Sequence, residues 1–450
     1  MSEINQEQVG NSEGKSTAIV LKKFGISALN SMQQEAGEVI QKKSDLVLLS
    51  PTGTGKTLAF LLPILQDLDR NGLEIQVLIL VPSRELAQQI EQVVRKMGSG
   101  FKVNAVYGGR AGMQDRIDLK HRPAILIGTP GRVADRFRRD SFSLNQIRTL
   151  ILDEFDKSLE IGFEEEMAEI IETLPNVQQR ILTSATSDAK IPDFVGMQEP
   201  VFISYLKAGD AKLTIKVILS PEKDKLAALV KSLAFIGHQP GIIFCNFKDA
   251  LGRVSEYLED HEIDHQCFHG GMEQVDRERA LIKFRNGTTR LLLATDLAAR
   301  GLDIPEIKFI LHYHLTPHQK EFTHRNGRTA RMNSDGVAYI LNWKDEPLPD
   351  FIQDIAPENL KIEDLPKAKI SSSVKWRTVY ITGGRRDKIS KGDIAGLFIK
   401  QGGIKKDQLG VIELQQSCAY AGVHAEVAER LIEKTNNTKL KKKKVRISMI

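Results

Sequence analysis

Cysteine is scarce in this chain, with only three among 450 residues. Cys245, Cys267 and Cys418 lie far apart, form no CxxC pair and leave an odd count, so neither a disulfide framework nor a structural zinc site is indicated. We expect ordinary buried thiols. Long hydrophobic runs are also missing, since no apolar stretch approaches the roughly 18 residues that span a bilayer. We therefore expect no membrane segment.

The N-terminal segment MSEINQEQVGNSEGKST is polar and lacks the charged-then-apolar pattern of a secretory signal, which predicts a cytoplasmic protein. Aromatic residues make up only 6%, but 41% hydrophobic and 27% charged residues are typical of a globular protein. At roughly 150 residues per domain, the length predicts about three domains.

Acidic and basic residues are unevenly distributed along the sequence. Residues 375–450 contain 17 Lys and Arg against 7 Asp and Glu, a net charge of +10, whereas the preceding 374 residues have a net charge of −5. Such asymmetry predicts a polyanion-binding C-terminal unit attached to a nearly neutral body.

Short β-branched runs ending in Gly, Pro, Ser or Thr recur through the first two thirds, separated by segments with helical periodicity. Apolar strands that alternate with helices are typical of a parallel sheet covered on both faces. Examples from the first series are DLVLLSPTG from Asp45, VLILVPSRE from Val77, AILIGTPGR from Ala124, TLILDEF from Thr149 and RILTSAT from Arg180. The second series is KVILSP from Lys216, GIIFCNF from Gly241, RLLLATD from Arg290, KFILHYH from Lys308 and VAYILN from Val337. Two α/β domains are therefore predicted, with ligands expected at the carboxyl ends of their strands.

The segment SPTGTGKT, Ser50 to Thr57, lies between a predicted strand and a predicted helix and is typical of a phosphate-binding loop, although the strict pattern has Gly in place of Ser50. Backbone N–H groups at the helix N-terminus can bind phosphates, Lys56, which we expect to be exposed, can reach the β and γ phosphates, and Thr57 can ligate Mg²⁺. The predicted ATP-binding residues of the loop are Thr52, Gly53, Thr54, Gly55, Lys56 and Thr57.

Asp153 and Glu154 end the predicted strand TLILDEFD, 97 residues after Lys56. Adjacent acids after a strand also suit a plain helix N-terminus, where the helix dipole favours them. With the phosphate loop upstream, the pair instead indicates an ATPase in which Asp153 holds Mg²⁺ and Glu154 orients the attacking water.

Seven short motifs follow one another in a fixed order: PSRELAQQ (82–89), YGG (107–109), TPGR (129–132), DEFD (153–156), SAT (184–186), ATDLAARGLD (294–303) and HRNGRTAR (324–331). Over about Gly25 to Asn342, this set resembles the DEAD-box RNA helicases. The resemblance implies two tandem RecA-like parallel-sheet domains that hydrolyse ATP with Mg²⁺ and bind RNA.

The resemblance also implies roles for individual residues. Gln33 would read adenine, Gly301 and Asp303 would contact the nucleotide, and Arg328 and Arg331 would act as arginine fingers from the second domain. Coupling between ATP and RNA is implied for Asp156, Ser184, Thr186 and His324. Sequence-independent RNA contacts are implied for Arg84, Gly108, Gly109, Thr129, Arg132, Gln274, Arg277 and Thr295.

Several positions depart from the family pattern. Phe155 replaces the usual alanine beside Asp156, His314 replaces the usual aspartate, and FGISALNSMQ precedes Gln33 without the usual upstream aromatic residue. His312, His314 and His318 have no adjoining acidic or thiol partner, so no structural metal is expected there.

From Thr378 onward, TVYITGGRRDKISKGDIAGLF resembles the opening of the RNA-binding domain in DbpA-type helicases. The pattern predicts strand, helix, strand, strand, helix, strand, a small α+β domain in the manner of an RRM. Only Tyr380 and Tyr420 are available for base stacking, so RNA binding is assigned to basic residues. The expected contacts are Arg385, Arg386 and Lys388, with lysines 441–444 equally consistent with a solvated tail.

The predicted domains are a polar extension (1–24), helicase domain 1 (25–206), helicase domain 2 (213–350), a linker (351–373) and the RNA-binding domain (374–450). The resulting hypothesis is a monomeric RNA helicase that unwinds structured ribosomal RNA during large-subunit assembly. An ATP-dependent RNA clamp without strand separation is the alternative, kept open by Phe155, and a DNA translocase is a more distant third.

Overall fold

The computed structural model describes residues 17–109, 112–139, 143–186, 190–206, 213–296, 307–329, 335–365 and 374–450. These residues form two compact units, a first that precedes residue 211 and a second that contains the described residues from 213 onward. Within the described ranges, no helix is long and apolar enough to cross a membrane.

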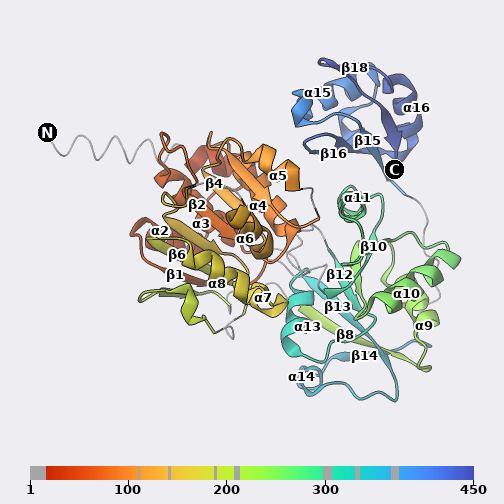
Figure 1. The fold of residues 1–450 in the computed structure, drawn as a ribbon. Helices are drawn as coiled ribbons and strands as arrows, with labels where there is room; N and C mark the ends of the chain where they lie inside the picture. Colours follow the sequence, from red (N-terminus) through yellow and green to blue (C-terminus); the bar gives the residue numbers. More distant parts are fainter. Residues whose placement is uncertain are drawn as a thin grey trace. The chain divides into compact units, whose positions relative to one another are not determined.

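The first unit is built on a parallel sheet of seven strands in the order β3-β4-β2-β5-β6-β1-β7 (Figure 1). The strands are β1 (Leu46–Leu49), β2 (Val77–Leu80), β3 (Val103–Val106), β4 (Ile125–Gly128), β5 (Thr149–Leu152), β6 (Gln179–Ser184) and β7 (Val201–Ser204). Because β6 lies between β1 and β5, the residues that follow these three strands share one edge of the sheet.

Helices cover both faces of this sheet. They are α2 (Ser31–Gln41), α3 (Lys56–Asp67), α4 (Arg84–Met97), α5 (Gly112–Asp118), α6 (Pro130–Arg139), α7 (Phe155–Ile161) and α8 (Glu164–Glu172), with a 3₁₀ turn η1 (Asp193–Val195). Leu46 and Leu48 of β1 pack in one hydrophobic cluster and Val47 in the other. Successive side chains of a strand point to opposite faces, so the two clusters lie on the two sides of the sheet.

The predicted boundary between the N-terminal extension (1–24) and helicase domain 1 is wrong. Residues 17–24 are helical, and Leu21 is buried in the same hydrophobic cluster as β1. An apolar side chain in the core stabilises this short helix on the first helicase domain. Residues 1–16 lie outside the described ranges.

The second unit contains another parallel sheet of seven strands, in the order β10-β11-β9-β12-β13-β8-β14. The strands are β8 (Leu213–Ser220), β9 (Gly241–Phe244), β10 (Gln266–Phe268), β11 (Leu291–Ala294), β12 (Phe309–His312), β13 (Gly336–Trp343) and β14 (Glu358–Lys361). The helices are α9 (Leu226–Ile236), α10 (Lys248–Asp260), α11 (Gln274–Arg285), α13 (Gln319–Asn326) and α14 (Asp350–Gln353).

The start of the predicted linker is also wrong. Strand β14 pairs with β8 at the edge of the sheet, and Ile352 of α14 packs with residues of β8 and β13. The segment 351–361 therefore belongs to the second helicase domain. The remaining linker prediction falls partly on residues 366–373, which lie outside the described ranges.

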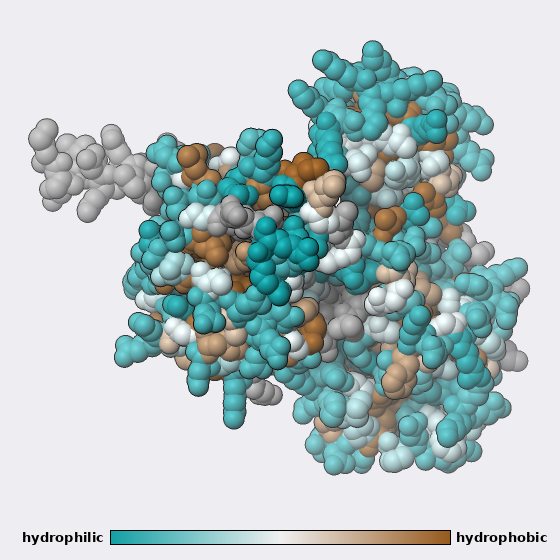
Figure 2. Space-filling view, in the orientation of Figure 1, coloured by the Kyte–Doolittle hydropathy of each residue, from teal (hydrophilic) through white to brown (hydrophobic). Residues whose placement is uncertain are grey.

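The C-terminal domain is a four-stranded antiparallel sheet in the order β16-β17-β15-β20. Its elements are β15 (Trp376–Ile381), η2 (Arg385–Asp387), α15 (Lys391–Gly396), η3 (Leu397–Gln401), η4 (Lys406–Gln408), β16 (Leu409–Leu414), β17 (Ala419–His424), α16 (Ala425–Thr435), β18 (Lys439–Leu440), β19 (Lys443–Lys444) and β20 (Ile447–Met449). The predicted order is confirmed, with the hairpin β18–β19 added. Figure 2 shows a largely hydrophilic surface over this domain, consistent with its lysine content.

Candidate nucleotide and RNA sites

The phosphate-binding loop connects β1 to α3, as predicted. Gly53 and Gly55 have φ angles of 84° and 90°, in the left-handed region that glycine adopts without strain. Thr54 closes the loop internally, because its Oγ1 donates to the Pro51 carbonyl at 2.9 Å and accepts from Ser50 Oγ at 2.8 Å. The loop therefore has a defined shape at the N-terminus of α3, where backbone N–H groups favour anions.

Lys56 is buried, contrary to the prediction that it is exposed, with a relative accessibility of 7%. Its Nζ donates to the Ser50 carbonyl and, at 3.1 Å, to the Pro51 carbonyl. An ammonium group that leaves water needs acceptors, and these carbonyls supply them. The loop thus holds the ammonium group against its own backbone carbonyls.

Gln33 lies against the phosphate loop. Its Nε2 donates to the Gly55 carbonyl at 3.2 Å, while Asn30 Nδ2 donates to the Thr54 carbonyl at 3.1 Å. Asn30 and Gln33 also form a reciprocal capping box at the start of α2. Asn30 was missed by sequence reasoning, although its spacing of three residues from a glutamine is the signal of such a box.

Asp153 is buried at the end of β5, and burial raises the pKa of its carboxyl group. A hydrogen bond from Thr183 Oγ1 and the positive charge of Lys56 act in the opposite direction and favour the carboxylate. Thr183 Oγ1 also accepts from the backbone N–H of Glu154 at 3.2 Å. Thr183, on β6, is a second residue that the sequence reasoning missed.

The three residues of the first unit with predicted coupling roles lie together at the same edge. Thr186 Oγ1 donates to Asp156 Oδ2 at 3.2 Å, and the Thr186 N–H donates to Ser184 Oγ at 2.9 Å. Glu154 precedes α7 in a left-handed conformation with φ 50°. Phe155 points the other way, into the hydrophobic cluster beneath the sheet, where it is 2% exposed.

In the second unit, Arg325 organises the carboxyl edge of the sheet. Its guanidinium forms a bidentate ion pair with Asp296, at 2.5 Å for each bond, and donates to Asn246 Oδ1 and the His314 carbonyl at 2.7 Å each. These partners follow β11, β9 and β12, which are adjacent strands. Sequence reasoning assigned Arg325 no role, although it stands inside HRNGRTAR.

Other predicted residues of the second unit lie on α11, directly after β11, and at the end of α13. Arg277 on α11 is buried and lies over the Phe268 ring at 4.8 Å, while Gln274 Nε2 donates to Glu278 Oε1 at 3.0 Å. The Thr295 N–H donates to the Phe268 carbonyl at 3.3 Å. His324 and the buried Arg328 lie at the end of α13 and just beyond it. The roles predicted for Gly301, Asp303 and Arg331 fall on residues outside the described ranges.

His312 is buried within the sheet edge rather than presented to a ligand. It stacks on Phe322 at 4.8 Å, and its Nε2 pairs with Asn326 Oδ1 at 3.0 Å. Burial and the nearby Arg325 lower the pKa of His312 to about 3, so the ring is neutral. Among the cysteines, Cys245 and Cys418 are buried as predicted, whereas Cys267 is only half-buried.

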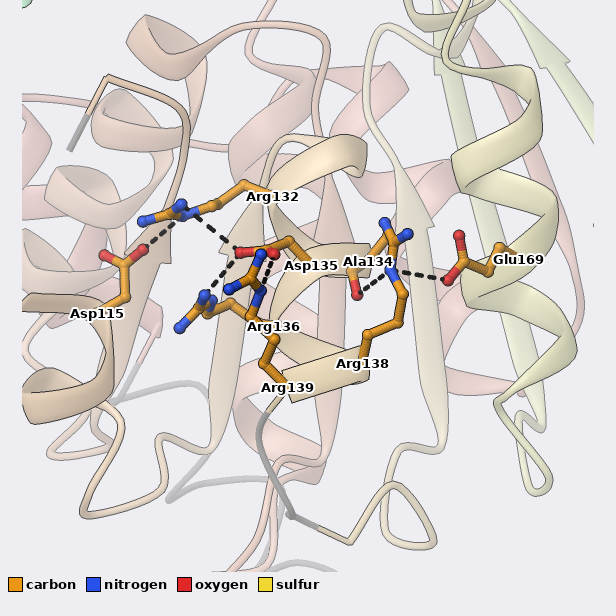
Figure 3. Close-up of polar contacts among 8 residues, drawn as sticks. All are labelled: Asp115, Arg132, Ala134, Asp135, Arg136, Arg138, Arg139 and Glu169. Atoms are coloured by element: carbon orange, nitrogen blue, oxygen red, sulfur yellow. Dashed lines mark hydrogen bonds and ion pairs between the residues drawn. The ribbon is translucent and has the colours of Figure 1, made fainter. Parts of the chain in front are cut away.

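The predicted RNA contacts of the first unit lie after adjacent strands. Gly108 and Gly109 are exposed after β3, and Thr129 precedes α6 after β4. Arg84 begins α4, after β2. Figure 3 shows Arg132 of α6 paired with Asp115 of α5, with 2.7 Å between Nε and Oδ2. Arg132 is therefore held in place by a fully buried carboxylate.

The basic residues of the C-terminal domain come together from two segments. Arg385 and Arg386 form η2, and Lys388 follows in a left-handed conformation with φ 58°. Asp387 of this turn accepts a hydrogen bond from Lys443 Nζ at 2.9 Å, which brings the lysine hairpin beside η2. Hydrogen bonds from Lys443 Nζ and from the Gly384 backbone N–H hold the pKa of Asp387 below its usual range.

The stacking expectation for the two tyrosines is wrong for Tyr420. Its ring is 3% exposed and packs with Ile282 of α11, while Tyr380 lies partly buried at the same cluster. Asn286 Nδ2 donates to Thr378 Oγ1 at 3.2 Å on the same side. Contact with α11 therefore covers the sheet face on which an ordinary RRM stacks bases.

Three family models match successive parts of the chain. The DEAD/DEAH box helicase model matches residues 30–194, the helicase conserved C-terminal domain model residues 224–333, and the DbpA RNA binding domain model residues 378–449. The matches follow the three domains of the structure in order.

Curated relatives match over nearly the whole length. The ATP-dependent RNA helicase DbpA of Bacillus subtilis is 30% identical, covering 95% of this chain and 96% of the relative. The ATP-dependent RNA helicase DbpA of Escherichia coli is also 30% identical, covering 96% of each.

Two solved structures share the fold of the helicase domains. The DEAD-box helicase Mss116 bound to single-stranded RNA and UDP-BeF is 26% identical with a TM-score of 0.68, covering 79% of this chain and 78% of Mss116. S. cerevisiae Dbp5 bound to RNA and ADP BeF₃ is 24% identical with a TM-score of 0.68, covering 78% of this chain and 94% of Dbp5, and shows the fold alone. The site geometry and these matches lead to one conclusion: the chain belongs to the DEAD-box family of ATP-dependent RNA helicases and carries a DbpA RNA-binding domain.

Proposed function

We propose that this helicase uses ATP to separate short duplexes or to remodel protein–RNA contacts on structured ribosomal RNA during assembly of the large ribosomal subunit. The observation that carries the proposal is the basic surface of η2 and the β18–β19 hairpin, joined by the Lys443–Asp387 ion pair. Arg386, Lys388 and Lys441 on this surface are exposed. Two loops at a fixed spacing suit the phosphates of a folded RNA better than a flexible tail would.

The nucleotide chemistry is assigned to the edge formed after β1, β5 and β6. Hydroxyl and carboxylate oxygens are the ligands that Mg²⁺ prefers, so Thr57 and Asp153 fit this ion, which neutralises phosphate charge when bound. Lys56 exchanges its two carbonyl acceptors for β and γ phosphate oxygens. Glu154 orients the attacking water, and Arg328 and Arg331 supply positive charge for phosphoryl transfer.

Adenine selection is assigned to Gln33. Its Nε2 contact with the Gly55 carbonyl couples the position of this amide to the shape of the phosphate loop. Asn30 is proposed as a positioning residue, because its side chain contacts both the loop and the N-terminus of α2.

We further propose that the protein acts as a monomer in the cytoplasm. The sequence-independent contacts assigned to Arg84, Thr129 and Arg277 would hold any RNA backbone, so the choice of substrate is assigned to the C-terminal domain. The clamp alternative depended on Phe155 altering the coupling residues. Because Phe155 is in the hydrophobic core while Asp156 contacts Thr186, we favour a helicase that separates strands over a clamp.

The test is RNA-stimulated ATP hydrolysis and strand release on three substrates of equal length. These are a duplex joined to a large-subunit ribosomal hairpin, the same duplex joined to a scrambled hairpin, and the DNA version of the first. We expect the ribosomal hairpin to give the fastest hydrolysis and ATP-dependent release. Equal stimulation by all three would refute the substrate assignment, and ATP-dependent binding without release would establish the clamp.

A matched pair of variants tests the selector surface. Arg385→Ala with Arg386→Ala removes two positive charges from the joined loops, whereas Lys405→Ala with Lys406→Ala removes two exposed charges outside them. We expect only the first pair to abolish the preference for the ribosomal hairpin. The same loss in both pairs would mean that net charge, rather than this surface, attracts RNA.

A further inference from the structure

Helix α6 carries four arginines, three of which converge on one carboxylate. Figure 3 shows Arg132, Arg136 and Arg139 around Asp135, while Arg138 points toward Glu169 of α8. The Arg136 Nη2 lies 2.6 Å from Asp135 Oδ2, the Arg132 Nη1 lies 3.7 Å from the same oxygen, and the Arg139 Nε pairs with Oδ1. Asp135 therefore spaces three guanidinium groups along one side of the helix.

The three arginines differ in how far they reach solvent. The side chains of Arg132 and Arg136 are 17% and 7% exposed, whereas that of Arg139 is 72% exposed. Only the Nε of Arg139 is bound to Asp135, and within the described ranges no acceptor contacts its two terminal nitrogens. A guanidinium fixed at Nε presents these nitrogens as a ready-made fork for two oxygens of a phosphate.

We propose that Arg139 is a further RNA-phosphate contact of the first helicase domain, extending the path that begins at Thr129 and Arg132. This proposal rests on the proposed RNA contacts of that helix. Arg139 follows Arg132 by seven residues, so their backbones are separated by about 10 Å along α6. That separation is large enough for Arg139 to contact a phosphate other than the one at Arg132.

Electrostatics favours an anionic partner at this position. Asp135 stays ionised because hydrogen bonds from Arg136 and Arg139 lower its pKa. Even with the carboxylates of Asp115 and Asp135 counted, the three arginines leave one positive charge at the exposed end of the cluster. RNA phosphate complements this excess, and phosphate contacts need no particular base.

The simpler explanation is that the last-turn arginines only stabilise α6. Cations near a helix C-terminus interact favourably with the dipole, and Arg139 forms an i, i+4 pair with Asp135. Arg138 provides the control, because it has the same charge and lies in the same turn. Its side chain is 59% exposed but pairs with Glu169 at 3.2 Å, away from the Asp135 cluster.

The experiment compares Arg139→Ala with Arg138→Ala in the full chain, using an unstructured oligouridine RNA and a non-hydrolysable ATP analogue. Each variant loses one positive charge from the same turn of α6, so a general electrostatic effect is equal in both. RNA affinity is measured at several potassium chloride concentrations, with thermal unfolding as the folding control.

We expect Arg139→Ala to weaken RNA binding about 5- to 10-fold and to flatten the log–log salt slope by about 0.7, the value for one phosphate contact on a single strand. Arg138→Ala should change neither quantity appreciably. Equal effects of the two variants, or no effect of either, would overturn the assignment of Arg139. Failure of the wild-type chain to hydrolyse ATP in response to RNA would instead refute the proposed function.

Discussion

Removing the hydroxyl group of Thr183 should shift the pH dependence of ATP hydrolysis. Burial raises the pKa of Asp153, and the Thr183 hydrogen bond is the largest interaction that opposes this increase. Thr183→Val keeps the shape of the side chain but removes the bond. Because the bond favours the carboxylate, its loss raises the pKa of Asp153 further.

The size of the shift follows from the strength of the bond. A hydrogen bond to a charged group contributes about 1.5–3 kcal/mol, and one pKa unit corresponds to about 1.4 kcal/mol. The acid limb of kcat/KM for ATP, which reports ionisations of the free enzyme, should therefore move to higher pH by about one to two units. The Mg²⁺ concentration needed for half-maximal activity should rise with it.

Two controls separate this effect from damage to the fold. Thr183→Ser retains the hydroxyl and should keep the wild-type acid limb. Thermal unfolding of Thr183→Val should show a loss of about 1–3 kcal/mol, because the backbone N–H of Glu154 also loses its acceptor. An unchanged acid limb in folded Thr183→Val would show that the bond does not set the ionisation of Asp153.

Four other variants test the assignments of the nucleotide site. Lys56→Ala should lower kcat by about 100-fold or more, since an electrostatic stabiliser of the transition state is lost, and near-wild-type hydrolysis would contradict its role. Arg328→Ala should lower kcat by about 1,000-fold with nucleotide affinity nearly unchanged, and an equal loss in both would exclude an arginine finger. Phe155→Ala should destabilise the fold by about 3–5 kcal/mol in chemical denaturation, because a ring that is 2% exposed leaves a cavity, and a small loss would contradict its place in the core. Asp153→Asn should abolish hydrolysis and raise the melting temperature near neutral pH. Because the pKa of Asp153 is raised in the fold, its contribution to stability is present at low pH and is lost as the carboxyl group ionises. A lower melting temperature would argue against this direction of the pKa shift.

The edge strands of the two sheets could not be predicted from the sequence. The ten strands predicted for the helicase domains all exist, whereas β3, β7, β10 and β14 were not predicted, and these are the edge strands of the two sheets. Central strands are buried on both faces and read as continuous apolar runs. An edge strand has fewer buried neighbours, so VFIS in β7 and ENLK in β14 expose most of their residues and carry no such pattern.

The location of the site was predictable for a related reason. Ligand-binding residues of a parallel sheet follow its strands, so Lys56, Asp153 and Ser184 could be assigned to one edge without knowing any distance. The hydrogen-bond partners of these residues were harder to predict from the sequence. Thr183 lies inside a strand, and only the pairing of β6 with β5 brings its hydroxyl to Asp153.

Burial was the other property that local patterns did not determine. A lysine in a glycine-rich loop is expected to be exposed. The ammonium group of Lys56 is instead buried, because it donates hydrogen bonds to the carbonyls of Ser50 and Pro51. A tyrosine on an RRM-like sheet reads as a stacking residue, but Ile282 of α11 covers Tyr420. In both cases, contacts that the local sequence pattern does not reveal decide the exposure of the side chain.

The departure of the phosphate loop at Ser50 has a conformational explanation. Only Gly53 and Gly55 of the loop have positive φ, whereas Ser50 does not, so no backbone requirement for glycine exists at position 50. The Ser50 N–H pairs with the Ser184 carbonyl of β6 at 3.0 Å, which extends the ladder of β1, and its hydroxyl is satisfied by Thr54. Gly55 has a φ of 90°, where a side chain is strained, and an added Cβ would also require the end of the Gln33 side chain, 2.4 Å away, to move. A side chain is therefore tolerated at position 50, where the backbone continues the strand, and strained at position 55, where φ is positive.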